Sequence, residues 1–186
     1  RIEHPQQLIN KAQWGKAAAH PALGAADYKL AVHLGNRRSV YTFCMCPGGT
    51  VVCAASEAGG VVTNGMSNYA RDGKNANAAL LVNVDPSDLQ SDDVLAGMHL
   101  QRHIEQAAYQ ATLAAGGSAY QAPAQSVGAF LKREKGIQFP HDSRGEHICA
   151  PTYARGVVAC DLHDIFPRFI TDALKQALPL LDRKLT

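Results

Sequence analysis

The spacing of apolar residues changes halfway along this chain of 186 residues. Between Tyr28 and Leu34, large apolar side chains occupy every second position, which is typical of a strand with one buried face. From residue 91 onward, apolar side chains recur every three or four residues, as they do on one face of a helix. Strands grouped before helices predict an α+β fold, in which an antiparallel sheet has helices packed on one face.

The first half of the chain predicts a series of strands joined by turns. The expected strands cover residues 28–34, 39–46, 50–55, 61–64 and 80–84. In the second of these, one face should carry Tyr41, Phe43 and Met45, and the other Val40, Thr42, Cys44 and Cys46. The Pro-Gly-Gly at 47–49 predicts a tight turn, after which the third strand returns beside the second. Residues 1–4 have the pattern of a strand end, and residues 64–77 are rich in Asn and Gly.

The second half predicts helices from capping residues and apolar faces. Expected helices follow His4-Pro5, lie between the cap cluster at 91–93 and Gly116-Gly117, cover residues 126–133, and begin near Pro167. The last helix is expected to end at Pro179, because proline has no N–H to continue the hydrogen-bond ladder. Residues 136–156 show little periodicity and predict a long loop, which could act as a lid.

Composition narrows the class of protein. Apolar residues make up 46% and charged residues 18% of the chain, a balance that excludes intrinsic disorder. The net charge of +2 comes without a basic run or interleaved aromatic residues, which argues against nucleic-acid binding. No apolar run reaches the ~18 residues that span a bilayer, so no membrane span is expected. Five cysteines without a secretory signal predict reduced thiols and a cytoplasmic protein.

Common catalytic and nucleotide-binding motifs are absent. The chain has no G-x-G-x-x-G dinucleotide motif, no phosphate-binding loop and no G-x-S-x-G nucleophile elbow. His99 and His103 are spaced like two ligands on one helix face, but Leu100 stands where the zinc motif has glutamate, so we expect solvated histidines. Asp161 and His163 could form an acid–base pair, and we favour a helix cap. A self-contained enzyme of a common class is therefore not expected.

Cys44 and Cys46 are two residues apart on an expected strand, which places both thiols on the same side. Their Cα atoms would be roughly 6.5 Å apart, at the long limit for an unstrained disulfide. His147 and Cys149 repeat the two-residue spacing, so the four side chains form an alternative zinc site. Buried cysteines also serve as small apolar core residues, and we favour that interpretation.

Several longer stretches carry distinctive patterns. They are R-I-E-H-P-Q at residues 1–6, L-G-A-A-D-Y-K-L at 23–30, S-V-Y-T-F-C-M-C-P-G-G-T-V-V at 39–52, V-V-T-N-G-M-S at 61–67 and R-D-G-K-N-A-N-A at 71–78. With thinner matches as far as residue 179, nearly the whole chain resembles a family of bacterial FAD-dependent dehydrogenases and oxidoreductases whose substrates are unassigned. The stretch at 41–49 is loosely similar to geranylgeranyl-reductase-like flavoproteins, in which an antiparallel sheet covers the flavin ring. It departs from their Y-x-W-x-F-P pattern, so no substrate is carried over.

The resemblance implies that residues 1–186 form one substrate-side domain, β-rich over 1–85 and helical over 91–186. Both chain ends look cut, which agrees with flanking FAD-binding halves outside the chain. The parent protein would be an FAD-dependent oxidoreductase, whereas this domain alone would be inactive and would hold no FAD. Its implied partners are the flanking FAD-binding domain of the same chain and a small-molecule substrate. The alternative is a zinc-stabilised or plain interaction module without redox chemistry.

The resemblance also points to two segments that face flavin or substrate. The candidates are Cys44, Met45, Cys46, Pro47, Gly48, Gly49, Thr63, Asn64, Gly65, Met66 and Ser67. Glycine lets a backbone approach a flat ring closely, and the short polar side chains among the candidates offer hydrogen bonds. Cys44 and Cys46 could act as a thiol relay near the flavin. Turn formation alone explains the glycines equally well.

Overall fold

The structure, a computed structural model, describes residues 1–35, 37–134, 136–137 and 149–185. Its strands are β1 (Ile2–Pro5), β2 (Ala31–His33), β3 (Ser39–Cys46), β4 (Gly49–Cys53), β5 (Thr63–Ser67), β6 (Asn75–Val82), β7 (Ala122–Ala124) and β8 (Val157–Ala159). Its helices are α1 (Gln6–Trp14), α2 (Pro86–Leu89), α3 (Ala96–Ala114), α4 (Val127–Lys132) and α5 (Arg168–Leu185), with 3-10 turns η1 (Gly15–Ala17) and η2 (Leu162–Asp164). The predicted α+β class is confirmed.

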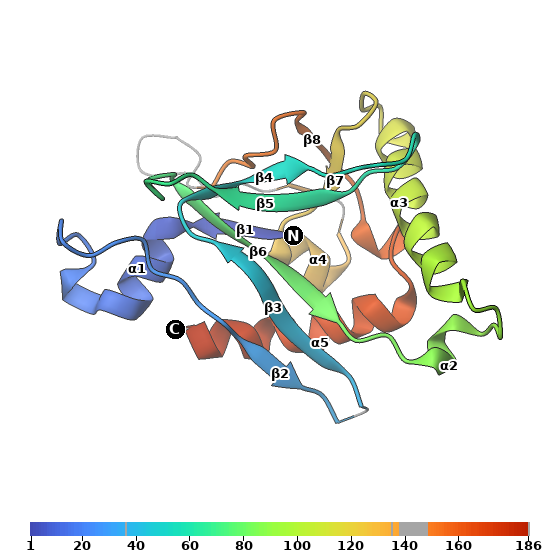
Figure 1. Ribbon diagram of the computed structural model, residues 1–186, viewed down its shortest axis with the longest axis horizontal. Helices are drawn as coiled ribbons and strands as arrows, with labels where there is room; N and C mark the ends of the chain where they lie inside the picture. Colours follow the sequence, from blue (N-terminus) through green and yellow to red (C-terminus); the bar gives the residue numbers. More distant parts are fainter. Residues whose placement is uncertain (36, 135, 138–148, 186) are drawn as a thin grey trace.

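The main sheet is antiparallel, with the strand order β1-β6-β3-β2. β4 and β5 form a separate antiparallel ribbon, while β7 and β8 pair in parallel. Figure 1 shows this ribbon crossing one end of β3 and β6. The ribbon contacts the main sheet where β4 meets β6 and β5 meets β3.

Helix α5 covers one face of the main sheet. Ala173 and Ala177 of this helix pack against Val32 of β2 and Val40 of β3. These side chains are buried because the helix presents small residues to the branched residues of the strands. In Figure 1, α5 passes behind β2 and β3, so the view looks onto the other face of the sheet.

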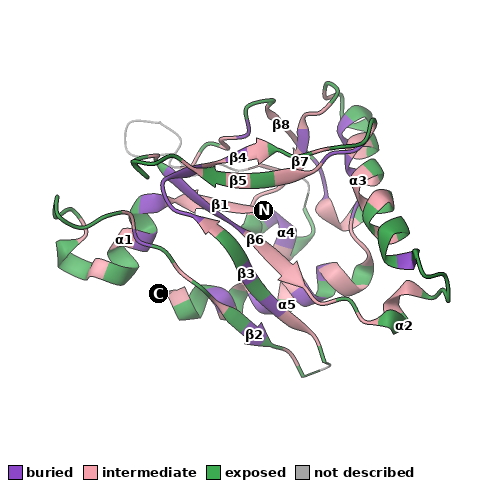
Figure 2. Ribbon diagram, viewed as in Figure 1, coloured by how far each residue is buried: buried purple, intermediate pink, exposed green. Residues whose placement is uncertain are grey.

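That other face carries Ala31, Tyr41, Phe43, Ala79 and Leu81, and we call it the open sheet face. Tyr41 pairs with Ala31 on one side and with Leu81 on the other, and Phe43 pairs with Ala79. The paired side chains therefore form one apolar strip across three strands. Tyr41 is 40% and Phe43 is 56% exposed, and the exposed stretch of β3 is visible in Figure 2.

A second core lies between the β4–β5 ribbon and helix α3. Val51 of β4 and Val61, just before β5, pack with Ala108 of α3 and with Tyr153 and Ile165 from the C-terminal part. The apolar face predicted for α3 is therefore confirmed. This core sets the ribbon and α3 on opposite sides of a common interior, which positions the cavity described below.

Several local predictions are confirmed by capping and strand bounds. β3 spans residues 39–46 as predicted, and residues 1–4 contribute to β1. The Ser126 side chain caps α4, and Asp161 accepts a 3.0 Å hydrogen bond from the backbone N–H of His163 as the predicted cap. His99 and His103 are exposed on α3, as expected for solvated histidines.

Strand pairing differs from the sequence-based expectation. β4 does not return beside β3, because β3 is flanked by β6 and β2 and the ribbon partner of β4 is β5. β6 begins at residue 75 rather than 80, since the side chains of Asn75 and Asn77 are buried and hydrogen-bonded within the fold. The expected strand at 28–34 is confirmed only over β2. β7 and β8 were not predicted, because each is only 3 residues long.

Pro179 lies inside α5 and does not end it, so that prediction is wrong. The proline is exposed, whereas Ala177 and Leu181 on either side are buried against the sheet. Solvent can therefore hydrogen-bond the carbonyl that the missing N–H leaves without a partner, while packing holds the helix together. Most of the predicted loop at 136–156, namely residues 138–148, lies outside the described residues.

Candidate functional site

β3 contains a bulge at Cys44. Phe43 pairs with Ala79 and Cys46 pairs with Asn77, so β3 uses one residue more than β6 over this stretch. Cys44 takes the left-handed φ of 44°, which is unusual for a residue other than glycine. As a result, Cys44 is exposed while Cys46 is buried. The prediction that both thiols lie on the same side is wrong, because the extra residue breaks the alternation of the strand.

The guanidinium of Arg1 joins several predicted site residues. Its Nε donates to Asn77 Oδ1 at 2.6 Å, and Nη1 donates to Asn64 Oδ1 at 3.3 Å. Nη2 donates to the carbonyl oxygen of Cys44 and lies 3.6 Å from the Sγ atom of Cys46. All four acceptors are uncharged. Arg1 was not among the predicted site residues, although its motif R-I-E-H-P-Q was a signal.

The glycines of the Pro-Gly-Gly turn are required by the chain itself. Gly48 has φ +51°, and a Cβ there would lie 1.9 Å from the carbonyl oxygen of Arg71. A Cβ on Gly49 would lie 2.4 Å from the carbonyl oxygen of Met66. The Ser67 hydroxyl donates to the Pro47 carbonyl at 2.8 Å and closes the turn. Close packing of backbone on backbone therefore accounts for both glycines without a ligand.

The remaining predicted site residues, most of them on β5, point to opposite sides because side chains alternate along a strand. Asn64 and Met66 are exposed, and Met66 is 53% exposed. Gly65 faces inward, where a Cβ would lie 2.2 Å from Asn77 Oδ1. Thr63 lines the interior cavity, and Met45 is half-buried beside the bulge. The structure thus brings Cys44, Cys46, Asn64 and Gly65 together around Arg1, whereas Thr63 lies in the wall of the interior cavity.

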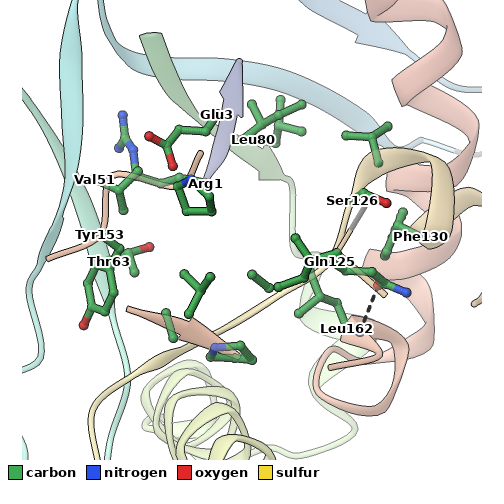
Figure 3. A pocket seen from close by; sticks show the side chains of 18 of the residues that line it. Arg1, Glu3, Val51, Thr63, Leu80, Gln125, Ser126, Phe130, Tyr153 and Leu162 are labelled. Carbon is green, nitrogen blue, oxygen red and sulfur yellow. Dashed lines mark hydrogen bonds between the residues drawn. The ribbon is translucent and has the colours of Figure 1, made fainter. Parts of the chain in front are cut away.

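A cavity of about 530 Å³ lies between the edge strand β1, the β4–β5 ribbon, β7 and helices α3, α4 and α5. Figure 3 shows its walls, with Val51, Leu80, Phe130 and Leu162 among the labelled apolar side chains. Sequence reasoning missed this cavity, because its walls come from elements that are far apart along the chain.

One end of the cavity holds the carboxylate of Glu3. It accepts hydrogen bonds from the Thr152 backbone N–H at 3.2 Å, from the Thr152 hydroxyl, and from Asn75 Nδ2 at 3.1 Å. Burial, followed by the nearby Glu3 charge, raises the pKa of the Cys149 thiol to about 11. Burial also lowers the pKa of His4. Near neutral pH both groups are therefore uncharged.

Cys53 lies at the end of β4, and its pKa is shifted in the opposite direction from that of Cys149. The Tyr153 side chain, then the Ala55 backbone N–H, and the nearby Arg155 lower the pKa of this exposed thiol. Cys53 was not predicted as a functional residue, because Tyr153 and Arg155, which help to lower its pKa, lie about a hundred residues away in the sequence. The Cys53 thiol is accessible, and it ionises more readily than that of an ordinary cysteine.

Metal-binding groups are not clustered in the part of the chain that the structure describes. Within it, no three His, Cys, Asp or Glu side chains are arranged to hold one ion. Of the alternative zinc set, Cys44 and Cys46 lie on different sides of the bulge, Cys149 lines the cavity, and His147 lies outside the described residues. The described helices also include none both long and apolar enough to cross a membrane.

Comparison with known proteins gives two matches. Residues 1–186 match the family model described as "FAD-dependent protein, C-terminal domain-like". The chain is also 45% identical over 186 residues to an "Uncharacterized protein" of Clostridium beijerinckii. That alignment covers 100% of this chain and 33% of the relative, so the chain spans a third of the length of the protein it matches.

Proposed function

Because the chain belongs to the FAD-dependent protein C-terminal domain-like family, we propose that it is the substrate-side domain of an FAD-dependent oxidoreductase. In this proposal the open sheet face covers the flavin ring, and a small-molecule substrate lies between the face and the ring. The flavin supplies hydride-transfer chemistry when it is bound. The domain's own residues bind and orient the substrate and exclude water.

The observation that carries the proposal is the exposure of Tyr41 and Phe43. Both lie on β3, an interior strand of the sheet whose other face is packed against α5. An antiparallel sheet with one solvated face normally alternates apolar and polar residues. Here the solvent side is also apolar, and such a patch marks a surface that something else covers. The relative from Clostridium beijerinckii is about three times as long as the matched region. A parent protein of that length would have enough further chain to cover the open sheet face.

The open sheet face fits a flavin ring better than a complete FAD molecule. Tyr41 and Phe43 offer a flat aromatic surface of the kind that stacks on a planar ring. At its edge, the Asn64 side chain and the Cys44 thiol are exposed and can meet polar atoms of a ring or a substrate. The sequence has no Gly-rich phosphate motif, so the dinucleotide tail would be held by another part of the protein.

The first test is the visible absorption spectrum of the full-length protein. We expect flavin bands that a reductant bleaches, with about one FAD per chain. The second test replaces Phe43 by glutamate, which places a charge against the ring. F43E should lower the FAD content or raise the quenching of flavin fluorescence by iodide, because the ring loses its cover.

Val94→Glu is the matched control, since Val94 is 96% exposed but lies far along the chain, just before α3. V94E should bind FAD and resist iodide as the unaltered protein does. A full-length protein that stays colourless after FAD is added would overturn the proposal and favour a plain interaction module. If F43E has the same FAD content and the same iodide quenching as V94E, the open sheet face does not contact the flavin.

The thiol relay has its own test. Cys44 is the member of the pair that a molecule on the open sheet face can reach, while Cys46 is buried. Cys44→Ser and Cys46→Ser are made separately in the full-length protein. Turnover that is unchanged in both variants would remove the relay.

A further inference from the structure

The cavity behind the β4–β5 ribbon has the size of a ligand site. Its volume of about 530 Å³ lies within the ~300–1,000 Å³ range of small-molecule pockets. Most of its wall is aliphatic, including the side chains of Ile170, Leu174 and Leu178 along one stripe of α5.

The polar side chains in the wall already have partners within the protein. Gln125 Nε2 donates to the Glu134 carbonyl at 2.6 Å, and its Oε1 accepts from the Leu162 N–H at 3.1 Å. The Tyr153 hydroxyl donates to the Tyr120 carbonyl at 3.1 Å. A ligand that competed for these groups would have to break bonds that hold the walls in place.

The same holds on the β1 side of the cavity. His4 Nε2 and the Tyr28 hydroxyl are 2.8 Å apart, and the Glu3 carboxylate accepts hydrogen bonds from Thr152 and Asn75. The guanidinium of Arg1 donates through Nε, Nη1 and Nη2 to the carbonyl and amide oxygens described above. The charged side chains in the described wall, Arg1 and Glu3, have opposite signs, and both are hydrogen-bonded within the protein.

We propose that this cavity binds a neutral, largely apolar small molecule that carries at most one hydrogen-bonding group. Thr63 is the partner for that group, because its hydroxyl lines the cavity and makes no hydrogen bond within the described part of the chain. The site is distinct from the open sheet face, since Thr63 and Val51 point inward from the ribbon while Asn64 and Met66 are exposed. The proposal therefore does not rest on the flavin assignment.

The test is saturable binding of Nile red, a neutral apolar dye, to the full-length protein. We expect about one dye per chain, with displacement by 1-octanol and none by malate. Ala108→Phe and Leu178→Trp each fill the cavity from a different helix, α3 and α5. Each should weaken dye binding by at least about tenfold. Ala114→Phe, at an exposed position of α3, should leave dye affinity unchanged.

Far-ultraviolet circular dichroism identifies any variant that fails to fold. If either A108F or L178W is unfolded, the other one tests whether filling the cavity weakens dye binding. Thr63→Val should keep dye binding but weaken 1-octanol, since only the alcohol uses the hydroxyl. FAD content of the same variants separates this proposal from the flavin assignment, because A108F and L178W lie away from the open sheet face. The proposal is overturned if folded protein binds no dye, if the filled variants bind it as A114F does, or if malate displaces it.

Discussion

Arg1 and Asn77 are joined by a 2.6 Å hydrogen bond from the guanidinium Nε to the side-chain Oδ1, across 76 positions of sequence. Asn77 is fully buried, and its Nδ2 has no hydrogen-bond partner within the described structure. The amide is therefore held by one strong bond to a charged donor. Arg1, the residue before β1, is connected to β6 by this bond and to the Cys44 carbonyl in the bulge of β3 through its Nη2.

The first prediction removes that bond. Asn77→Ala leaves the guanidinium without its main acceptor, and a lost hydrogen bond to a charged group costs about 1.5–3 kcal/mol. We expect the free energy of unfolding in urea to fall by that amount. Asn68→Ala, at an exposed position after β5, serves as the control and should be neutral. Equal stability of N77A and N68A would show that the cluster around Arg1 does not hold the strands together.

The second prediction concerns Gly48. Alanine there would have to adopt φ +51° and would place its Cβ 1.9 Å from the Arg71 carbonyl oxygen. Left-handed backbone and overpacking each cost roughly 1–3 kcal/mol, so Gly48→Ala should destabilise the protein by at least about 2 kcal/mol. Gly24→Ala is the control, because a Cβ at Gly24 meets nothing within 4 Å. Thermal unfolding of the two variants measures the difference.

The third prediction is a pH dependence at the ion pair between Arg38 and Asp88. Arg38 donates to both carboxylate oxygens, with Nη1 at 2.6 Å from Oδ2, and the pair joins the residue just before β3 to α2. The hydrogen bond from Arg38 holds the pKa of Asp88 below its usual value of 3.8. A carboxyl group whose pKa is lower in the folded than in the unfolded state stabilises the fold at pH values above its unfolded pKa. This contribution is lost as the pH falls through its folded pKa.

Asp88→Asn should therefore lower the free energy of unfolding by about 1 kcal/mol at neutral pH. The difference from the unaltered protein should shrink as the pH falls below the usual carboxyl pKa of 3.8 and through the lower pKa of Asp88 in the folded state. Urea titrations at several pH values measure it, with Asp92→Asn at an exposed position as the control. A difference that stays constant into acid would contradict the role assigned to the pair.

The fourth prediction ranks the thiols by their reaction with iodoacetamide at neutral pH. Cys53 is exposed and its pKa is lowered by Tyr153, so its peptide should be labelled first. Cys44 is exposed and should follow, whereas Cys149, with a pKa of about 11, should be slow. Mass spectrometry of timed samples gives the order. Tyr153→Phe should slow Cys53 and leave Cys44 unchanged, and labelling of Cys149 as fast as Cys53 would contradict this account.

Part of the candidate site was accessible from the sequence. The segments around Cys44 and Asn64 were predicted together, and the structure joins them through Arg1. The two aromatic residues of β3 were also correctly placed on one face, opposite Val40. What the pattern could not supply was the bulge, because an extra residue in one strand is visible only when its partner strand is known.

The sequence by itself determined the features that depend on neighbours within a few positions. Alternation placed Tyr41 and Phe43 on one face of β3, and Ser126 and Asp161 began their helical turns, because spacing and capping are local properties. Only the tertiary structure decided the partner of β3, the separation of Cys44 from Cys46, the burial of Asn77, the passage of α5 through Pro179, and the apolar cavity. Each of these depends on contacts between distant segments, whose packing energy overrides the local preference of the residues involved.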